Sequence, residues 1–134
     1  MTAHARGSFD VRLTPQVDAD LKDSGLSRMT ADKQFHGDLE GTGKGQMLAF
    51  GTGAKGSSGG YVALERVTGT LNGKRGSFTL QHTGTMTRGV PQLTVTVVPD
   101  SGTDQLTGIS GKLTITAAAG KHSYDFEYTL AESR

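Results

Sequence analysis

Apolar and polar residues alternate with a period of two along much of the chain. Within residues 3–13, Ala5, Phe9, Val11 and Leu13 fall on one side, and charged or polar residues occupy the alternate positions. Because successive side chains of a strand point to opposite faces, this pattern predicts a half-buried β-strand. Strand-like segments of the same kind occupy residues 33–40, 45–50, 61–71, 76–83, 92–98, 112–117 and 122–130.

Turn-forming residues separate these segments. Asn72-Gly73 stands between two alternating runs, and this pair predicts a tight hairpin because both residues tolerate a positive φ. Gly41-Thr42-Gly43 is expected to turn the chain between the second and third segments. Pro99-Asp100-Ser101-Gly102 has the composition of a β-turn, and Gly108 to Gly111 predicts another.

The predicted elements indicate a single all-β domain, spanning residues 1–134, of about eight strands with little helix. Twenty glycines occur in the chain, several of them inside the predicted strands. Closure into a barrel removes exposed strand edges, and glycines within strands permit the coiling that closure requires. We therefore expect one closed antiparallel β-barrel, with a β-sandwich as the alternative.

Two stretches show neither the two-residue period of a strand nor the 3.6-residue period of a helix, and they are expected to be loops. Residues 14–28 are charged and form a loop with one short helical turn near residues 17–22. Residues 51–60 are rich in glycine and serine and form a flexible loop. A phosphate-binding glycine loop would be followed by a helix, whereas the segment after residue 60 is strand-like, so this function is not expected.

The charge balance and the absence of cysteine narrow the function classes. The formal net charge is +1, which provides no strong field for nucleic acid or an anionic membrane surface. The expected partner is a small-molecule ligand, and a homo-oligomer is also considered. The chain has no cysteine, which fits a reducing compartment. With no signal-like start and no long apolar run, the protein is expected to be soluble and cytoplasmic.

Glu65 is the first candidate for chemistry. It shares a strand face with Tyr61, Ala63 and Val67, so it is expected to point inward if that face is buried. Desolvation would then raise the pKa of its carboxyl group and suit it to proton transfer near neutral pH. The alternative is structural: Glu65 pairs with an inward basic residue, or is hydrogen-bonded to a tyrosine or histidine, and fixes the strand register.

Two histidines lie on the faces that are expected to be apolar. His82 follows Phe78 and Leu80, and His122 precedes aromatic residues at alternate positions. Either histidine would act as a proton relay or a hydrogen-bonding group for a ligand, or would be solvated near a strand end. The candidate catalytic residues are therefore Glu65 and His82. The candidate ligand-binding residues are Tyr61, Phe78, His122, Tyr124 and Tyr128.

Other kinds of site have little support. The histidines at positions 4, 36, 82 and 122 show none of the short spacings that place two ligands on one element, so no metal is expected. The serines of residues 56–59 and 108–111 lie in turns rather than at a nucleophile elbow. No nicotinamide, flavin or nucleotide motif occurs, so no cofactor is expected. Surface charges are expected for the lysines at positions 33, 44, 55, 74, 112 and 121.

Four stretches together carry a family resemblance. They are LSRMTADKQFHGDLEG (residues 26–41), GYVALERVTGTLNGKRGSFTLQHTG (residues 60–84), VVPDSGTDQLTGISG (residues 97–111) and HSYDFEYTL (residues 122–130). In combination, and over most of the chain, they resemble the bacterial domain-of-unknown-function family 3224. The resemblance implies a small eight-stranded antiparallel barrel like that of allene oxide cyclase. It brings no established activity.

Allene oxide cyclase closes an unstable epoxide inside its barrel and is trimeric, but this chain is too distant for the resemblance to imply that reaction or assembly. Three hypotheses therefore remain. The first is a barrel that binds a small hydrophobic or mixed-polarity molecule. The second is a cofactor-independent isomerase or cyclase in which Glu65 moves a proton. The third is a non-catalytic oligomeric accessory protein whose barrel is packed solid.

Overall fold

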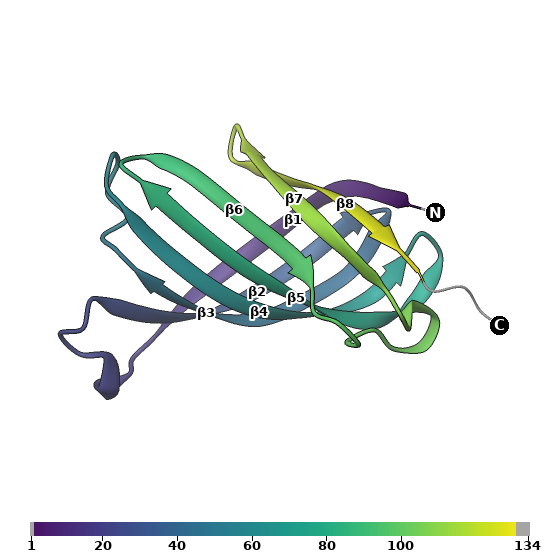
Figure 1. The fold of residues 1–134 in the computed structure, drawn as a ribbon, viewed down its shortest axis with the longest axis horizontal. Helices are drawn as coiled ribbons and strands as arrows, with labels where there is room; N and C mark the ends of the chain where they lie inside the picture. The colour runs from purple at the N-terminus through teal and green to yellow at the C-terminus, as the bar shows by residue number, and fades with distance from the viewer. Residues whose placement is uncertain (1, 131–134) are drawn as a thin grey trace.

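A computed structural model describes residues 2–130 and shows one closed antiparallel barrel of eight strands (Figure 1). Each strand pairs with the next along the chain, and β8 pairs with β1 to close the barrel. The predicted barrel is confirmed, and the sandwich alternative is wrong. The strands are β1 (Ala3–Gln16), β2 (Leu26–Gly37), β3 (Leu39–Phe50), β4 (Gly59–Leu71), β5 (Lys74–Thr87), β6 (Val90–Val97), β7 (Ser110–Ala118) and β8 (Lys121–Thr129).

The turn between β2 and β3 is not where the sequence predicted it. The chain reverses at Asp38, whose backbone N–H donates to the carbonyl oxygen of Arg6, 3.1 Å away. Gly37 has a φ of 107°, which only glycine adopts easily. Gly41 and Gly43 therefore belong to β3, together with Gly45, rather than to a turn.

Other connections are shorter than expected. β1 continues to Gln16 and β2 begins at Leu26, so the first loop spans only residues 17–25 and contains the short 3-10 turn η1 (Ala19–Leu21). The glycine-rich loop ends where β4 begins at Gly59. The predicted hairpin at Asn72-Gly73 is confirmed, with φ values of 46° and 85°. The η2 turn (Asp104–Leu106) was not predicted.

One half of the barrel is filled with side chains. This filled half lies at the end that carries the β2–β3 and β4–β5 turns and η2. Phe78 stacks on Phe126 with ring centroids 5.4 Å apart, and Phe126 stacks on Tyr128 at 5.2 Å. The largest fully buried side chains of the barrel are Phe35, Phe78, Phe126, Leu39, Leu71, Leu80, Leu106, Val67 and Val95. The other half of the barrel, whose strand connections include residues 17–25 and 51–58, is called the mouth half.

The barrel wall is weakest between β6 and β7. These strands are bridged at one residue pair, Thr96 and Lys112, whereas β7 and β8 pair in continuous register from Ser110 to Ala118. A small groove of about 290 Å³ follows this seam and is lined by residues of β6 and β7. In the part of the chain that the structure describes, no helix has the length and apolar character needed to cross a membrane.

Candidate functional site

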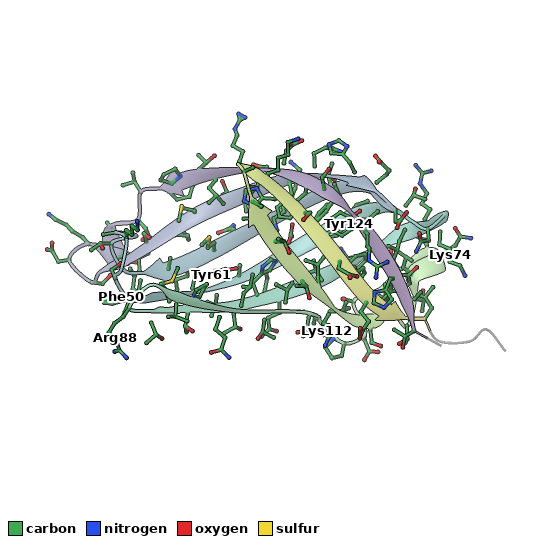
Figure 2. The ribbon with its side chains drawn as sticks, turned by 90° about the horizontal axis from the view of Figure 1, so that it is seen from above. Phe50, Tyr61, Lys74, Arg88, Lys112 and Tyr124 are labelled. Atoms are coloured by element: carbon green, nitrogen blue, oxygen red, sulfur yellow. The ribbon has the colours of Figure 1, made fainter. Side chains whose placement is uncertain are left out.

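The mouth half of the barrel contains a cavity of about 870 Å³. Its wall is mainly apolar and includes residues from all eight strands. Figure 2 labels Tyr61 in the same half as Phe50 and Arg88, away from Tyr124 and Lys74. Among the lining residues are Phe9, Val11, Met47, Tyr61, Met86 and Leu93. A pocket of this size and apolar character, with a few polar groups, is typical of a small-molecule site.

The polar part of the cavity wall is a cluster of three charged or titratable side chains, which we call the Lys33–Glu65–His82 cluster. Glu65 Oε1 lies 2.9 Å from His82 Nε2 and accepts a hydrogen bond from Lys33 Nζ at 3.2 Å. The Glu65 and His82 side chains are 4% and 6% exposed, and Lys33 is 10% exposed. The predicted inward position of Glu65 and its proximity to His82 are thus found in the structure.

The position of the cluster depends on the glycines of β3. Lys33 is paired in register with Gly43, and Glu65 is paired with Gly45. Since neither glycine has a side chain, Lys33 of β2 and Glu65 of β4 reach each other across the intervening strand. A Cβ atom at Gly43 would overlap Glu65 Oε2.

The electrostatics of Glu65 differ from the sequence prediction. Burial alone would raise the pKa of the Glu65 carboxyl group, as was expected. The hydrogen bond with His82 and the positive charge of Lys33 outweigh burial and hold this pKa below its ordinary value. The predicted upward shift is therefore wrong, and Glu65 is an ionised, paired carboxylate at neutral pH.

The second carboxylate oxygen of Glu65 takes no part in these contacts with Lys33 and His82. Oε2 is buried and accepts no hydrogen bond from the residues that the structure describes. A buried acceptor without a donor is costly, so such atoms are rare and often functional. Glu65 therefore combines the structural alternative, an ion pair, with a second carboxylate oxygen that lies outside that pair.

Lys33 is the functional candidate that the sequence analysis missed. It was expected on the surface, but its ammonium group lies inside the barrel, 4.8 Å from the centroid of the Phe9 ring. A cation at this position is attracted to the face of the ring. The signal in the sequence was alternation: Lys33 stands two residues before Phe35 and two after Ala31, on the inward face of β2.

Tyr61 and His122 also line the cavity. The Tyr61 ring centroid lies 6.3 Å from that of His82. Burial, together with the negative charge of Glu65, raises the pKa of the Tyr61 hydroxyl, which therefore remains a hydrogen-bond donor at neutral pH. His122 stacks on Phe9 with ring centroids 5.1 Å apart. Both predicted residues thus lie where a ligand in the cavity would meet them.

The other three predicted ligand-binding residues are in the filled half. Phe78 is fully buried against Phe126, and Tyr128 accepts a hydrogen bond from Asn72 Nδ2 at 2.7 Å. The Tyr124 hydroxyl accepts from the Leu39 N–H at 2.9 Å and donates to a backbone carbonyl. The expectation that these residues line one cavity with Glu65 is wrong, because the same face continues beyond the cavity into packed core.

The other histidines do not join the cluster. His4 Nδ1 lies 2.9 Å from Asp125 Oδ1, and His36 Nε2 lies 3.3 Å from Asp10 Oδ2, both at exposed positions. Between residues 2 and 130, no group of three or more histidine, aspartate or glutamate side chains is arranged to hold a metal ion.

Comparison with known proteins finds one matching family and a similar crystal structure from that family. The family model described as "Protein of unknown function (DUF3224)" matches residues 5–128. A crystal structure of a DUF3224 protein of unknown function from Shewanella oneidensis MR-1 is similar, with a TM-score of 0.90 and 43% sequence identity. That similarity covers 99% of this chain and 100% of the other. No curated protein matches the chain.

Proposed function

The chain belongs to the DUF3224 family, whose function is unknown, and we propose that it binds a neutral, largely apolar small molecule inside the mouth half of its barrel. The observation that carries this proposal is the cavity of about 870 Å³ with the Lys33–Glu65–His82 cluster in an otherwise apolar wall. Apolar walls provide affinity through burial, and a few fixed polar groups orient the ligand.

The charges of the cluster determine the class of ligand. The positive charge of Lys33 and the negative charge of Glu65 neutralise each other, since Lys33 Nζ lies 3.2 Å from Glu65 Oε1. A ligand with a net charge would enter an apolar cavity without a counter-ion, which is unfavourable. A neutral ligand with an acceptor oxygen would receive hydrogen bonds from the free Nζ protons of Lys33 and from the Tyr61 hydroxyl. Ketones, aldehydes, esters and alcohols with a hydrocarbon chain meet this description.

Three probes of equal chain length test the proposal. Decan-2-one, decanoate and decylammonium differ in charge but present similar apolar surface. A ligand that binds only the folded state raises stability, by about 2.7 kcal/mol at a hundred times its Kd. We expect decan-2-one to raise the thermal unfolding temperature and the two ions to raise it less. Equal effects of all three, or none with decan-2-one, would contradict the proposed neutral ligand.

A matched pair of variants locates the binding. Ala63 lines the cavity, whereas its neighbour Val62 is 53% exposed on the outside of β4. Ala63→Phe places an aromatic ring inside the cavity and is expected to reduce the effect of decan-2-one. Val62→Phe adds the same aromatic ring outside and should leave the effect unchanged.

One observation favours a second candidate, a cofactor-independent isomerase or cyclase. Glu65 is ionised, and within the described part of the chain its Oε2 accepts no hydrogen bond, as a general base would require. Its lowered pKa means that Glu65 rests ionised and is a weaker base than an ordinary carboxylate, so binding is the stronger proposal. Glu65→Gln keeps the size of the side chain, and it would remove turnover of an identified substrate while retaining much of its binding.

The accessory-protein hypothesis required a barrel packed solid and an apolar outer patch. The cavity contradicts the first requirement. For the second, Leu48, Val62 and Leu64 are exposed at 37%, 53% and 56% on the outside of β3 and β4. Homo-oligomer formation through this face therefore stays a prediction, which light scattering of the purified protein checks. A monomer at high concentration would contradict it.

A further inference from the structure

We propose that Lys33 captures aldehydes in the cavity as a reversible covalent imine. This inference rests on the proposed function, because the aldehyde must first bind in the mouth half of the barrel. It assigns to the Lys33–Glu65–His82 cluster a chemical activity rather than only a role in holding a ligand.

Lys33 differs from every other lysine of the protein in its surroundings. All seven lysines lie within the described residues, and six of them are exposed. The Lys33 side chain is 10% exposed and faces the cavity. An aldehyde bound there is held beside a single amine, and such proximity greatly accelerates a bimolecular reaction. The chain also has no cysteine, so no thiol competes for the aldehyde.

The groups around Lys33 would stabilise the protonated imine as well as the free ammonium group. Glu65 Oε1, 3.2 Å from Nζ, already balances the ammonium charge. A protonated imine at the same nitrogen carries the same single positive charge, so Glu65 serves as its counter-ion without rearrangement. The Phe9 ring, 4.8 Å away, would face the planar cation. The apolar wall limits the water that hydrolyses an imine.

The reaction balances with groups that the site contains. A proton passes from the Lys33 ammonium to the Glu65–His82 pair, and the free amine attacks the aldehyde carbon. A new C–N bond forms, the carbonyl π electrons move to oxygen, and a proton moves from nitrogen to that oxygen to give a carbinolamine. The Glu65–His82 pair then returns its proton to the hydroxyl group. The C–O bond breaks, water leaves and the protonated imine remains.

His82 supports the proton transfers through its contact with Glu65. Its Nε2 lies 2.9 Å from the carboxylate oxygen that Lys33 also contacts. A proton leaving Lys33 therefore has both a carboxylate and an imidazole within one hydrogen-bonded unit. General acid–base groups so placed typically contribute about 10²–10⁴-fold to the rate of a proton-transfer step.

Reductive trapping of the imine tests the proposal. The full chain is incubated with decanal and sodium cyanoborohydride, which converts the imine to a stable secondary amine, and the modified lysines are identified by peptide mass spectrometry. We expect Lys33 to be modified at least about tenfold faster than any exposed lysine, because only there is the aldehyde held beside the amine. Decan-1-ol, which cannot form an imine, should slow the modification by competition.

Two arginine variants serve as matched controls. Lys33→Arg keeps the positive charge opposite Glu65 but cannot form this imine, and it should lose the rapid modification. Lys44→Arg replaces a lysine that is 78% exposed and should leave Lys33 modification unchanged. Circular dichroism of both variants checks that the barrel remains folded.

Binding of decan-1-ol to the unmodified protein, measured by calorimetry, separates the two levels of proposal. If decan-1-ol binds but decanal modifies Lys33 no faster than the exposed lysines, the imine proposal is overturned and the binding proposal stands. If neither compound binds and modification is uniform, both proposals fail. Rapid modification at Lys33 that decan-1-ol suppresses supports both.

Discussion

Lys33 and His82 contact the same oxygen of Glu65, at 3.2 and 2.9 Å, while the other oxygen of that carboxylate accepts no hydrogen bond from residues 2–130. A residue from β2 and one from β5 are thereby joined through one from β4. The arrangement neutralises a buried lysine and leaves a polar group at a cavity. Its stability and its binding properties can be tested separately.

Loss of the Glu65 carboxylate should be strongly destabilising. Glu65→Ala leaves the Lys33 ammonium buried without its counter-ion, and breaking a buried ion pair in this way costs about 3–5 kcal/mol. The double variant Lys33→Met/Glu65→Leu removes both charges and should recover much of that loss. Urea unfolding of the two variants measures the difference. A double variant no more stable than Glu65→Ala would contradict the ion pair as the source of the effect.

The lowered pKa of Glu65 predicts a particular pH dependence. Because the pKa in the folded state lies below the ordinary value of 4.5, the folded protein holds the ionised form more strongly than the unfolded chain does. The resulting stability is complete above pH 4.5 and is lost as the pH falls through the folded-state pKa. Urea unfolding at a series of acidic pH values should show a smaller acid loss in Glu65→Gln than in the wild type.

Asp125 provides the control for that experiment. The hydrogen bond from His4 is the main cause that lowers the pKa of this exposed carboxyl group, so Asp125 also contributes to the loss of stability in acid. The comparison is therefore made in an Asp125→Asn background. The two proteins compared are Asp125→Asn and the double variant Asp125→Asn/Glu65→Gln. If both lose the same free energy of unfolding on acidification, Glu65 is not the source of the acid-dependent stability.

Gly43→Ala should disturb the cluster without adding a polar group. The new methyl group would overlap Glu65 Oε2, and overpacking of this kind typically costs about 1–3 kcal/mol. Gly60→Ala is the matched control, since its methyl group would lie 3.4 Å from the nearest atom, the carbonyl oxygen of Gly84. Equal unfolding free energies of the two variants would contradict the close approach across β3.

Two tyrosine variants separate the packed core from the cavity. Tyr124→Phe removes a hydroxyl that bonds the backbone of the β2–β3 turn, and it should lower stability by about 1–2 kcal/mol without changing ligand affinity. Tyr61→Phe removes the hydroxyl that would donate to the ligand oxygen, so it should lower the affinity for decan-2-one and leave the free energy of unfolding nearly unchanged. Denaturant unfolding and calorimetry of both variants check this, and the reverse assignment would contradict the division of the barrel.

The barrel could be predicted because its strands and turns leave local signals in the sequence: alternating apolar and polar residues, and short turn-forming pairs. The face of Glu65 follows from its two-residue spacing to Tyr61, Ala63 and Val67, and the Asn72-Gly73 hairpin follows from the φ that these residues tolerate. The depth of a residue along the barrel axis does not follow from alternation. Phe78 and His82 share a face of β5, yet one is packed core and the other lines the cavity.

Lys33 was missed for a related reason. The sequence predicted a turn at residues 41–43 and a third strand that began at Gly45, so Gly43, the partner of Lys33 in the register, was left out of the strand. Without that register, nothing in the sequence shows that a lysine on β2 can reach a carboxylate on β4. The hydrogen bond with His82 is the main cause that lowers the pKa of Glu65, and the contact with Lys33 lowers it further, so the direction could not be deduced from burial alone.

The most direct test of the central claim is an NMR titration of methionine methyl groups with decan-2-one. Met47 and Met86 both line the cavity and report on its occupation without any label on the ligand. We predict saturable shifts of both signals in the wild type and in Val62→Phe, and a weaker apparent affinity in Ala63→Phe. Unchanged Met47 and Met86 signals in the wild type, or an equal apparent affinity in Ala63→Phe, would contradict binding in the mouth half of the barrel.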